Sequence, residues 1–132
     1  MNATKHISEK KRFSIIARGR SFKYAVRGLS IIAKTQHNFW IQVVAVAVAV
    51  GLGVWLRIAH LEWALLVIVM AAVLVTESIN TAFEIDIDLT SPEYHPYAKD
   101  TKDVAAGAVL LSVVGAVVVG GIIFIPKLLL LL

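Results

Sequence analysis

The chain has 132 residues, of which 58% are hydrophobic and 17% are charged, and it contains no cysteine. Soluble domains are closer to half apolar and a quarter charged, so this composition excludes an ordinary soluble globular protein, and disulfide or thiolate chemistry is excluded as well. The net charge is +4, and nine of the 13 Lys and Arg residues precede residue 36.

The first 35 residues are polar and basic, unlike the rest of the chain. Residues 1–12 predict a disordered basic tail. Residues 13–35 place apolar and basic side chains at helical spacing, which predicts an amphipathic helix on the membrane surface. A basic segment of this kind also suits nucleic acid, but next to spanning helices we expect an anionic lipid bilayer as its partner and no nucleic acid.

Residues 36–132 form the predicted membrane domain. Apolar runs at about 38–57, 61–82 and 104–125 are each long enough to cross a bilayer as a helix, which takes roughly 20 residues. The excess of Lys and Arg before the first run places the N-terminus in the cytoplasm, and the first two crossings return residues 84–103 to that side. The sequence therefore predicts an all-α, multi-pass protein of a cytoplasmic membrane.

A polar stripe follows the second apolar run. Helical spacing puts Glu77, Asn80, Glu84 and Asp88 on one helix face, while Asp86 points the opposite way. Ionisable side chains are costly near a bilayer and usually persist for a function. A plain solvated helix end is the alternative, but an amide between two carboxylates suits metal or phosphate chemistry better.

Further polar residues lie on the same predicted cytoplasmic side: Glu93, His95, Lys99, Asp100, Lys102 and Asp103. Carboxylate and amide oxygens suit Mg²⁺, and lysines at a helix start suit a phosphate. A carboxylate at the hydrocarbon boundary suits a general base for a hydroxyl. The glycine-rich phosphate loop and the dinucleotide fingerprint are both missing, so the set predicts phosphoryl transfer from ATP to a membrane alcohol outside the familiar nucleotide folds.

Three strings carry a resemblance to a known family: residues 21–29 (SFKYAVRGL), 77–84 (ESINTAFE) and 98–109 (AKDTKDVAAGAV). Over about residues 20–125 the chain resembles the small prokaryotic integral-membrane lipid kinases, the diacylglycerol kinases and their undecaprenol kinase relatives. The third string is similar to the undecaprenol kinase branch. The resemblance implies a homotrimeric helical bundle in the prokaryotic plasma membrane, with active sites shared between subunits and with Mg²⁺ and ATP.

The same resemblance implies roles for individual residues. Glu77 would be the general base that meets the lipid alcohol, with Asn80 as a polar partner in the active site. Glu84 would bind the metal and the nucleotide. The other implied contacts are nucleotide binding at Tyr24, His95, Lys102 and Asp103 and a further metal contact at Asp88. Trp40 is a candidate substrate contact, but its place near the end of an apolar run favours a membrane anchor.

Two positions depart from the family pattern. Gln36 stands where the family carries a glutamate that shares the metal with the equivalent of Glu84, and Trp40 stands where many members have arginine. A glutamine brings no charge, so we expect weaker metal binding, with Asp86 or Asp88 able to compensate. Two alternatives to the kinase stay open: a catalytically attenuated trimeric protein that binds lipid or nucleotide, and an ion pathway that uses the intramembrane carboxylate.

Overall fold

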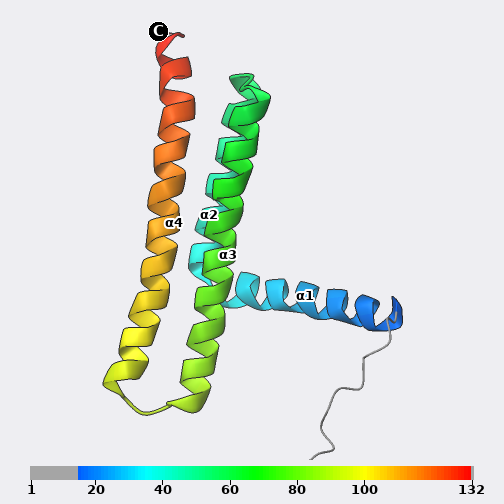
Figure 1. The fold of residues 1–132 in the computed structure, drawn as a ribbon, viewed down its shortest axis with the longest axis vertical. Coiled ribbons are helices and arrows are strands. Elements are labelled where there is room, and N and C mark those ends of the chain that lie inside the picture. The colour runs from blue at the N-terminus through cyan, green and yellow to red at the C-terminus, as the bar shows by residue number, and fades with distance from the viewer. Residues whose placement is uncertain (1–14, 132) are drawn as a thin grey trace, which may run out of the picture.

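The computed structural model describes residues 15–131, with the backbone alone at Ile16 and Ala17. The disordered tail predicted for residues 1–12 lies outside this range. The described chain forms four helices and no strand (Figure 1): α1 (Ile15–Thr35), α2 (His37–Trp55), α3 (His60–Thr90) and α4 (Pro96–Leu129). The helices α2, α3 and α4 run side by side, and α1 lies crosswise to them.

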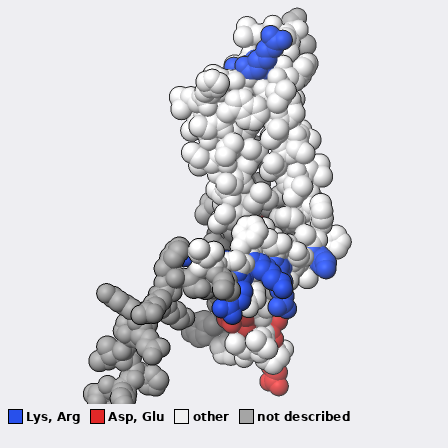
Figure 2. Space-filling model, turned by 90° about the vertical axis from the view of Figure 1, so that its right-hand side faces the viewer, with Lys and Arg blue, Asp and Glu red and all other residues white. Residues whose placement is uncertain are grey.

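The helices α2, α3 and α4 are each long and apolar enough to cross a membrane, which confirms the all-α fold class with three predicted spans. α3 has 31 residues and α4 has 34, so each is roughly 45–50 Å long and exceeds the hydrocarbon core of about 30 Å. Both helices therefore continue past the hydrocarbon. Figure 2 shows the consequence: the middle of the bundle carries no visible charge, and charged side chains gather at its ends.

A single extended residue separates α1 from α2. Gln36 has φ −110° and ψ 112°, and the chain turns there from the crosswise α1 into the bundle (Figure 1). Trp40, in the first turn of α2, donates its indole N–H to the carbonyl oxygen of Ala33 at 2.8 Å. The last carbonyl groups of a helix have no partner within it, so this hydrogen bond satisfies one of them and stabilises the corner.

The opposite end of the bundle is closed by a tight turn between α2 and α3. Gly53 lies so near the ring of Trp63 that a Cβ atom at residue 53 would be 2.8 Å from Cη2 of the indole. Glu62 accepts a hydrogen bond from the backbone amide of Ala59 at 2.6 Å and forms an ion pair with Lys127 of α4 at 3.1 Å. These contacts join three helices at this end.

The buried apolar core is small and lies near the same turn. It consists of Ile58, Leu66, Ile123 and Phe124, with partly buried side chains packed around them. Elsewhere the described helices expose many large apolar side chains, which in a chain with three candidate spans are expected to face lipid or other subunits.

Candidate active site

Glu77 is the one charged side chain in the described part of the chain that is fully buried, with 2% of its surface exposed. It lies in the middle of α3, where the hydroxyl of Thr81 donates to the Glu77 carbonyl oxygen at 2.9 Å. The Glu77 carboxylate accepts a hydrogen bond from Nε2 of Gln42, on α2, at 2.8 Å. Because a buried carboxylate is costly unless it is hydrogen-bonded, this amide is an essential part of the site.

Glu84, two turns further along α3, accepts hydrogen bonds from two amides. Nε2 of Gln36, at the corner between α1 and α2, donates to Oε2 at 3.0 Å. Nδ2 of Asn80 donates to Oε1 at 2.9 Å. Gln36 thus meets Glu84 as the family pattern implies, but it does so through its N–H group and not through its carbonyl oxygen.

Two ion pairs lie beyond Glu84, where α3 and α4 meet. Lys102 of α4 pairs with Asp88 of α3, and Lys99 pairs with Asp103 one turn further along α4. The side chains of Lys102 and Asp88 are 35% and 68% exposed, so a solute in water can reach them. Two of the residues to which the resemblance assigns nucleotide or metal contacts, Lys102 and Asp88, are therefore direct neighbours.

Exposure increases along the stripe in the direction of the chain. Glu77 and Asn80 are buried, Glu84 is half-buried, and Asp88 is exposed. Asp86, predicted to point away from the stripe, is exposed as well. One helix face thus passes from a dry environment to a wet one within three turns.

The residues around Glu84 fit a divalent cation such as Mg²⁺. Oδ1 of Asn80 is a buried oxygen without a hydrogen-bond partner among the described residues, and it belongs to the amide that contacts Glu84. Mg²⁺ takes oxygen ligands and needs only one or two carboxylates when phosphates supply the others. Among residues 15–131 no group of three or more His, Asp or Glu side chains could hold a metal. Phosphate oxygens would supply further ligands to an ion held at Glu84 and Asn80.

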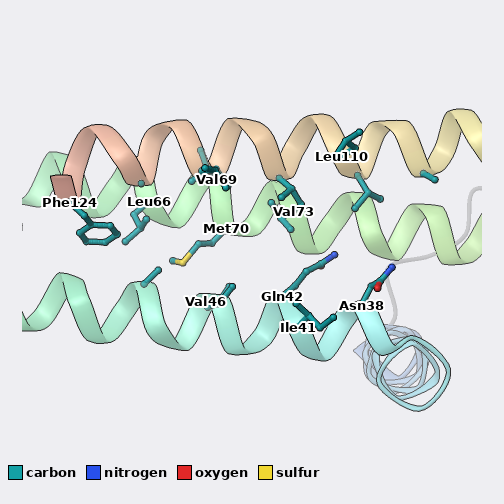
Figure 3. A pocket seen from close by; sticks show the side chains of 18 residues that line it. Asn38, Ile41, Gln42, Val46, Leu66, Val69, Met70, Val73, Leu110 and Phe124 are labelled. Carbon is teal, nitrogen blue, oxygen red and sulfur yellow. The ribbon is translucent and has the colours of Figure 1, made fainter.

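An apolar groove of about 480 Å³ begins beside Gln42. It runs between α2 and the pair of α3 and α4, past Met70 to Phe124 at the far end (Figure 3). Asn38 and Gln42 are its polar lining residues, and both lie on α2 at the same end of the groove. The volume is within the range of roughly 300–1,000 Å³ typical of ligand sites. The groove suits a hydrocarbon chain whose polar end lies at Gln42.

Three predicted contacts lie apart from these groups. Tyr24 is on α1 with 64% of its surface exposed, and His95 precedes α4 with its ring 5.7 Å from that of Tyr97. Trp40 is 55% exposed, and its indole N–H is used at the corner between α1 and α2. Within the described residues none of these three side chains hydrogen-bonds to the carboxylates of α3, so their roles stay predictions.

Gln42 is the site residue that the sequence analysis missed. Gln42 lies within an apolar run, between Ile41 and Val43. A polar side chain inside a predicted span is itself a signal of function, because it needs a hydrogen-bond partner within the protein. The sequence held this signal, but it did not show that the partner would be Glu77.

The chain is similar in sequence to known proteins. Residues 23–124 match the family described as prokaryotic diacylglycerol kinase. The undecaprenol kinase of Bacillus subtilis (strain 168) is 34% identical over 128 residues, which cover 97% of this chain and 100% of that protein. A diacylglycerol kinase of Synechocystis is 43% identical over 113 residues, 83% of this chain and 63% of that longer protein.

The diacylglycerol kinase of Escherichia coli (strain K12) is 30% identical over 95 residues, which cover 72% of this chain and 78% of that protein. The family match includes the corner at Gln36, the whole of α3 and most of α4, and hence both carboxylates and the groove. The chain therefore belongs to the prokaryotic diacylglycerol kinase family, and it is a lipid kinase with membrane-spanning helices.

Proposed function

We propose that the protein transfers the γ-phosphate of ATP, with Mg²⁺, to the hydroxyl group of a membrane lipid at the cytoplasmic face of a prokaryotic plasma membrane. The observation that carries this proposal is the order of groups along α3. A buried carboxylate, Glu77, is hydrogen-bonded to Gln42 in the wall of the groove; Asn80 and Glu84 follow along α3, and the partly exposed Lys102 of α4 pairs with Asp88 beyond them. Lipid phosphorylation requires this order, because the lipid lies in hydrocarbon and the nucleotide lies in water. The lipid hydroxyl meets the buried end, and the metal with the phosphates of the nucleotide meets the more exposed end.

Glu77 acts as the general base. The hydrocarbon chain of the acceptor lies in the groove, and its hydroxyl group lies at the polar end beside Gln42 and Glu77. The hydroxyl oxygen forms a bond to the γ-phosphorus while the bond from that phosphorus to the β-phosphate oxygen breaks, and ADP leaves with the electron pair. The hydroxyl proton passes to the Glu77 carboxylate. Burial of this carboxylate keeps bulk water away and so favours the lipid over water as acceptor.

The phosphate groups lie further along α3. Glu84 and Asn80 would hold the ion, which when bound neutralises the negative charge of the phosphates. Lys102 exchanges its ion pair with Asp88 for a contact with a phosphate, because a lysine ammonium is a point charge that suits a phosphate oxygen. Asp103, with Tyr24 and His95 as the resemblance implies, contacts the rest of the nucleotide.

The acceptor is diacylglycerol or undecaprenol, and relatives of this chain carry both names. The Bacillus subtilis protein that matches along its whole length is named an undecaprenol kinase, which favours undecaprenol. Both lipids have a hydrocarbon part that suits the groove and one hydroxyl group.

We further propose a homotrimer in which the subunits share their active sites. The monomer leaves Oδ1 of Asn80 without a partner, and it exposes the neighbouring apolar side chains Ile79 and Phe83 on α3. A second copy of the chain would cover these side chains and supply groups that one chain lacks.

The direct test is phosphorylation of each lipid by the purified full chain in detergent, with Mg²⁺ and labelled ATP. Diacylglycerol and undecaprenol are offered in parallel, and the labelled lipid is measured. Asp86→Asn serves as the matched control, because Asp86 is an exposed carboxylate of the same helix. It makes no hydrogen bond to Glu84 or Asn80 in the described structure, so the proposed mechanism gives it no metal contact. The control variant should phosphorylate lipid at the rate of the unmodified protein.

Incorporation of phosphate into either lipid identifies the acceptor. If neither lipid is phosphorylated by a protein that keeps its oligomeric state and binds ATP, the kinase proposal is wrong. That result would favour the alternative of a catalytically attenuated binding protein. The contact between Gln36 and Glu84 is compatible with that alternative, because a glutamine brings no charge to the metal site.

A further inference from the structure

Gln42 has no part in the transfer step described above, although it contacts the base. It lies in the second turn of α2 and reaches α3, with Nε2 at 2.8 Å from Oε2 of Glu77. Its other amide atom, Oε1, is buried and has no hydrogen-bond partner among the described residues. Both facts concern one side chain in the wall of the groove.

The chemistry of the pair fixes the orientation of the Gln42 amide. An ionised carboxylate accepts hydrogen bonds and donates none, so the NH₂ group must face Glu77 and Oε1 must face elsewhere. A buried carbonyl oxygen without a donor destabilises the protein, and native structures rarely contain one without a reason. An apolar side chain of equal size would avoid that cost at this position, so packing alone does not explain the amide.

We propose that Gln42 positions Glu77 and docks the hydroxyl group of the lipid acceptor; this inference rests on the lipid kinase function proposed above. Nε2 holds Oε2 of Glu77, which leaves the second carboxylate oxygen to take the proton. Before transfer, the lipid hydroxyl at the polar end of the groove donates to Oε1 of Gln42 and gives this oxygen its missing donor. As the hydroxyl oxygen attacks phosphorus, its proton passes from this hydrogen bond to Glu77.

Asn38 provides a matched comparison within the same groove. It lies one helical turn before Gln42, on the same face of α2, and its side chain also lines the polar end (Figure 3). It makes no hydrogen bond to Glu77 within the described structure, whereas Gln42 does. If any amide at the polar end of the groove could dock the hydroxyl group, Asn38 and Gln42 would be equivalent. The proposal assigns the docking role to Gln42 alone.

The test compares each lipid alcohol with its methyl ether, which keeps the hydrocarbon chain but has no proton to donate. Binding is measured on the full chain, without ATP, by displacement of a fluorescent lipid by dioleoylglycerol, undecaprenol and their O-methyl ethers. The unmodified protein should bind the alcohol that it phosphorylates at least fivefold more tightly than the ether. Gln42→Leu should bring this ratio close to one and lower kcat by about 10- to 100-fold, with the KM for ATP within twofold.

The control variant Asn38→Leu should keep the preference for the alcohol. Gln42→Met, an unbranched side chain of similar length, repeats the test if the leucine variant does not fold, and thermal unfolding in detergent monitors both. The proposal is overturned if Gln42→Leu retains both kcat and the preference. It is overturned too if the KM for ATP rises by the same factor by which kcat falls, since that result is expected when Gln42 has only a structural role. Failure of the kinase function looks different, because the unmodified protein then phosphorylates neither lipid.

Discussion

The two carboxylates of α3 that face α2 are each held by a glutamine, yet their surroundings differ. Glu77 is buried beside an apolar groove, whereas Glu84 is half-buried and shares its oxygens between Gln36 and Asn80. A carboxylate with little access to water suits proton transfer from a lipid hydroxyl, and one surrounded by amide groups near the water suits an ion with phosphates. Their surroundings therefore separate the two roles.

The first prediction concerns the base. Glu77→Gln keeps the size and the hydrogen-bonding capacity of the side chain but removes its ability to take a proton. We expect kcat for lipid phosphorylation to fall by at least roughly 100-fold, while the affinity for ATP changes less than threefold. Turnover and nucleotide binding are measured on the same preparation. A variant with full turnover would show that another group accepts the proton.

A second prediction concerns position 36. In the present structure Nε2 of Gln36 lies 3.0 Å from Oε2 of Glu84. Gln36→Glu therefore places a second carboxylate against Glu84. Two facing carboxylates attract a divalent cation, so the Mg²⁺ concentration for half-maximal activity should fall by about tenfold, or ~1.4 kcal/mol. Stabilisation of the protein by Mg²⁺ in a thermal unfolding experiment should increase in parallel. If both titrations are unchanged, residue 36 does not contact the metal.

At the scale of the elements, the two ends of α2 make different contacts with α3. Its first residues turn out of α1 at Gln36 and bring that side chain to Glu84. Its last turns pack against α3 through Gly53 and Trp63. Between these ends the groove separates α2 from α3 and α4 (Figure 3). The closed end therefore holds α2 close to α3 at the end of the groove that lies far from Gln42.

The third prediction tests this closed end. Gly53→Ala puts a Cβ atom 2.8 Å from the ring of Trp63, so the indole ring or the backbone of the two helices must shift. Overpacking of this kind costs about 1–3 kcal/mol, and the midpoint of thermal unfolding in detergent should fall by several degrees. Gly51→Ala is the matched control, because a Cβ atom there meets nothing within 4 Å. Equal midpoints for the two variants would contradict close packing at Gly53.

At the scale of the whole molecule, one chain leaves much of its apolar surface uncovered. Leu111 and Val117 of α4 are 75% and 68% exposed, and Ile68 of α3 is 64% exposed. Lipid covers such surfaces in a membrane, and so do neighbouring subunits. The polar groups proposed for catalysis are also divided between two regions of the chain, since Glu77 lies in the middle of α3 and Lys102 lies near the start of α4.

The fourth prediction tests whether subunits share sites. Glu77→Gln and Lys102→Gln should each be inactive alone. If one site takes Glu77 from one subunit and Lys102 from another, coexpression of both variants gives intact sites in about a quarter of the random pairings. Phosphorylation of lipid by the coexpressed mixture measures this recovery. Mixing after purification, without exchange of subunits, is the control. No recovery after coexpression would place both residues of each site in one chain.

The sequence alone was sufficient to predict the secondary-structure elements. Four helices, their order and the end of the second apolar helix before Pro92 follow from hydropathy, charge and proline, which act within short segments of chain. The stripe of Glu77, Asn80 and Glu84 follows from helical periodicity. The extension of α3 past the apolar span, as far as Thr90, follows from the same proline signal.

Only the tertiary structure decided which α2 side chains meet these carboxylates. Gln42 and Glu77 are 35 residues apart, and Gln36 and Glu84 are 48 apart. Spacing along a helix determines which residues share a face, but the packing of two helices determines which faces meet and in what register. The sequence therefore determined a membrane protein with a polar stripe, whereas helix packing decided that its most buried carboxylate is held by an amide beside an apolar groove.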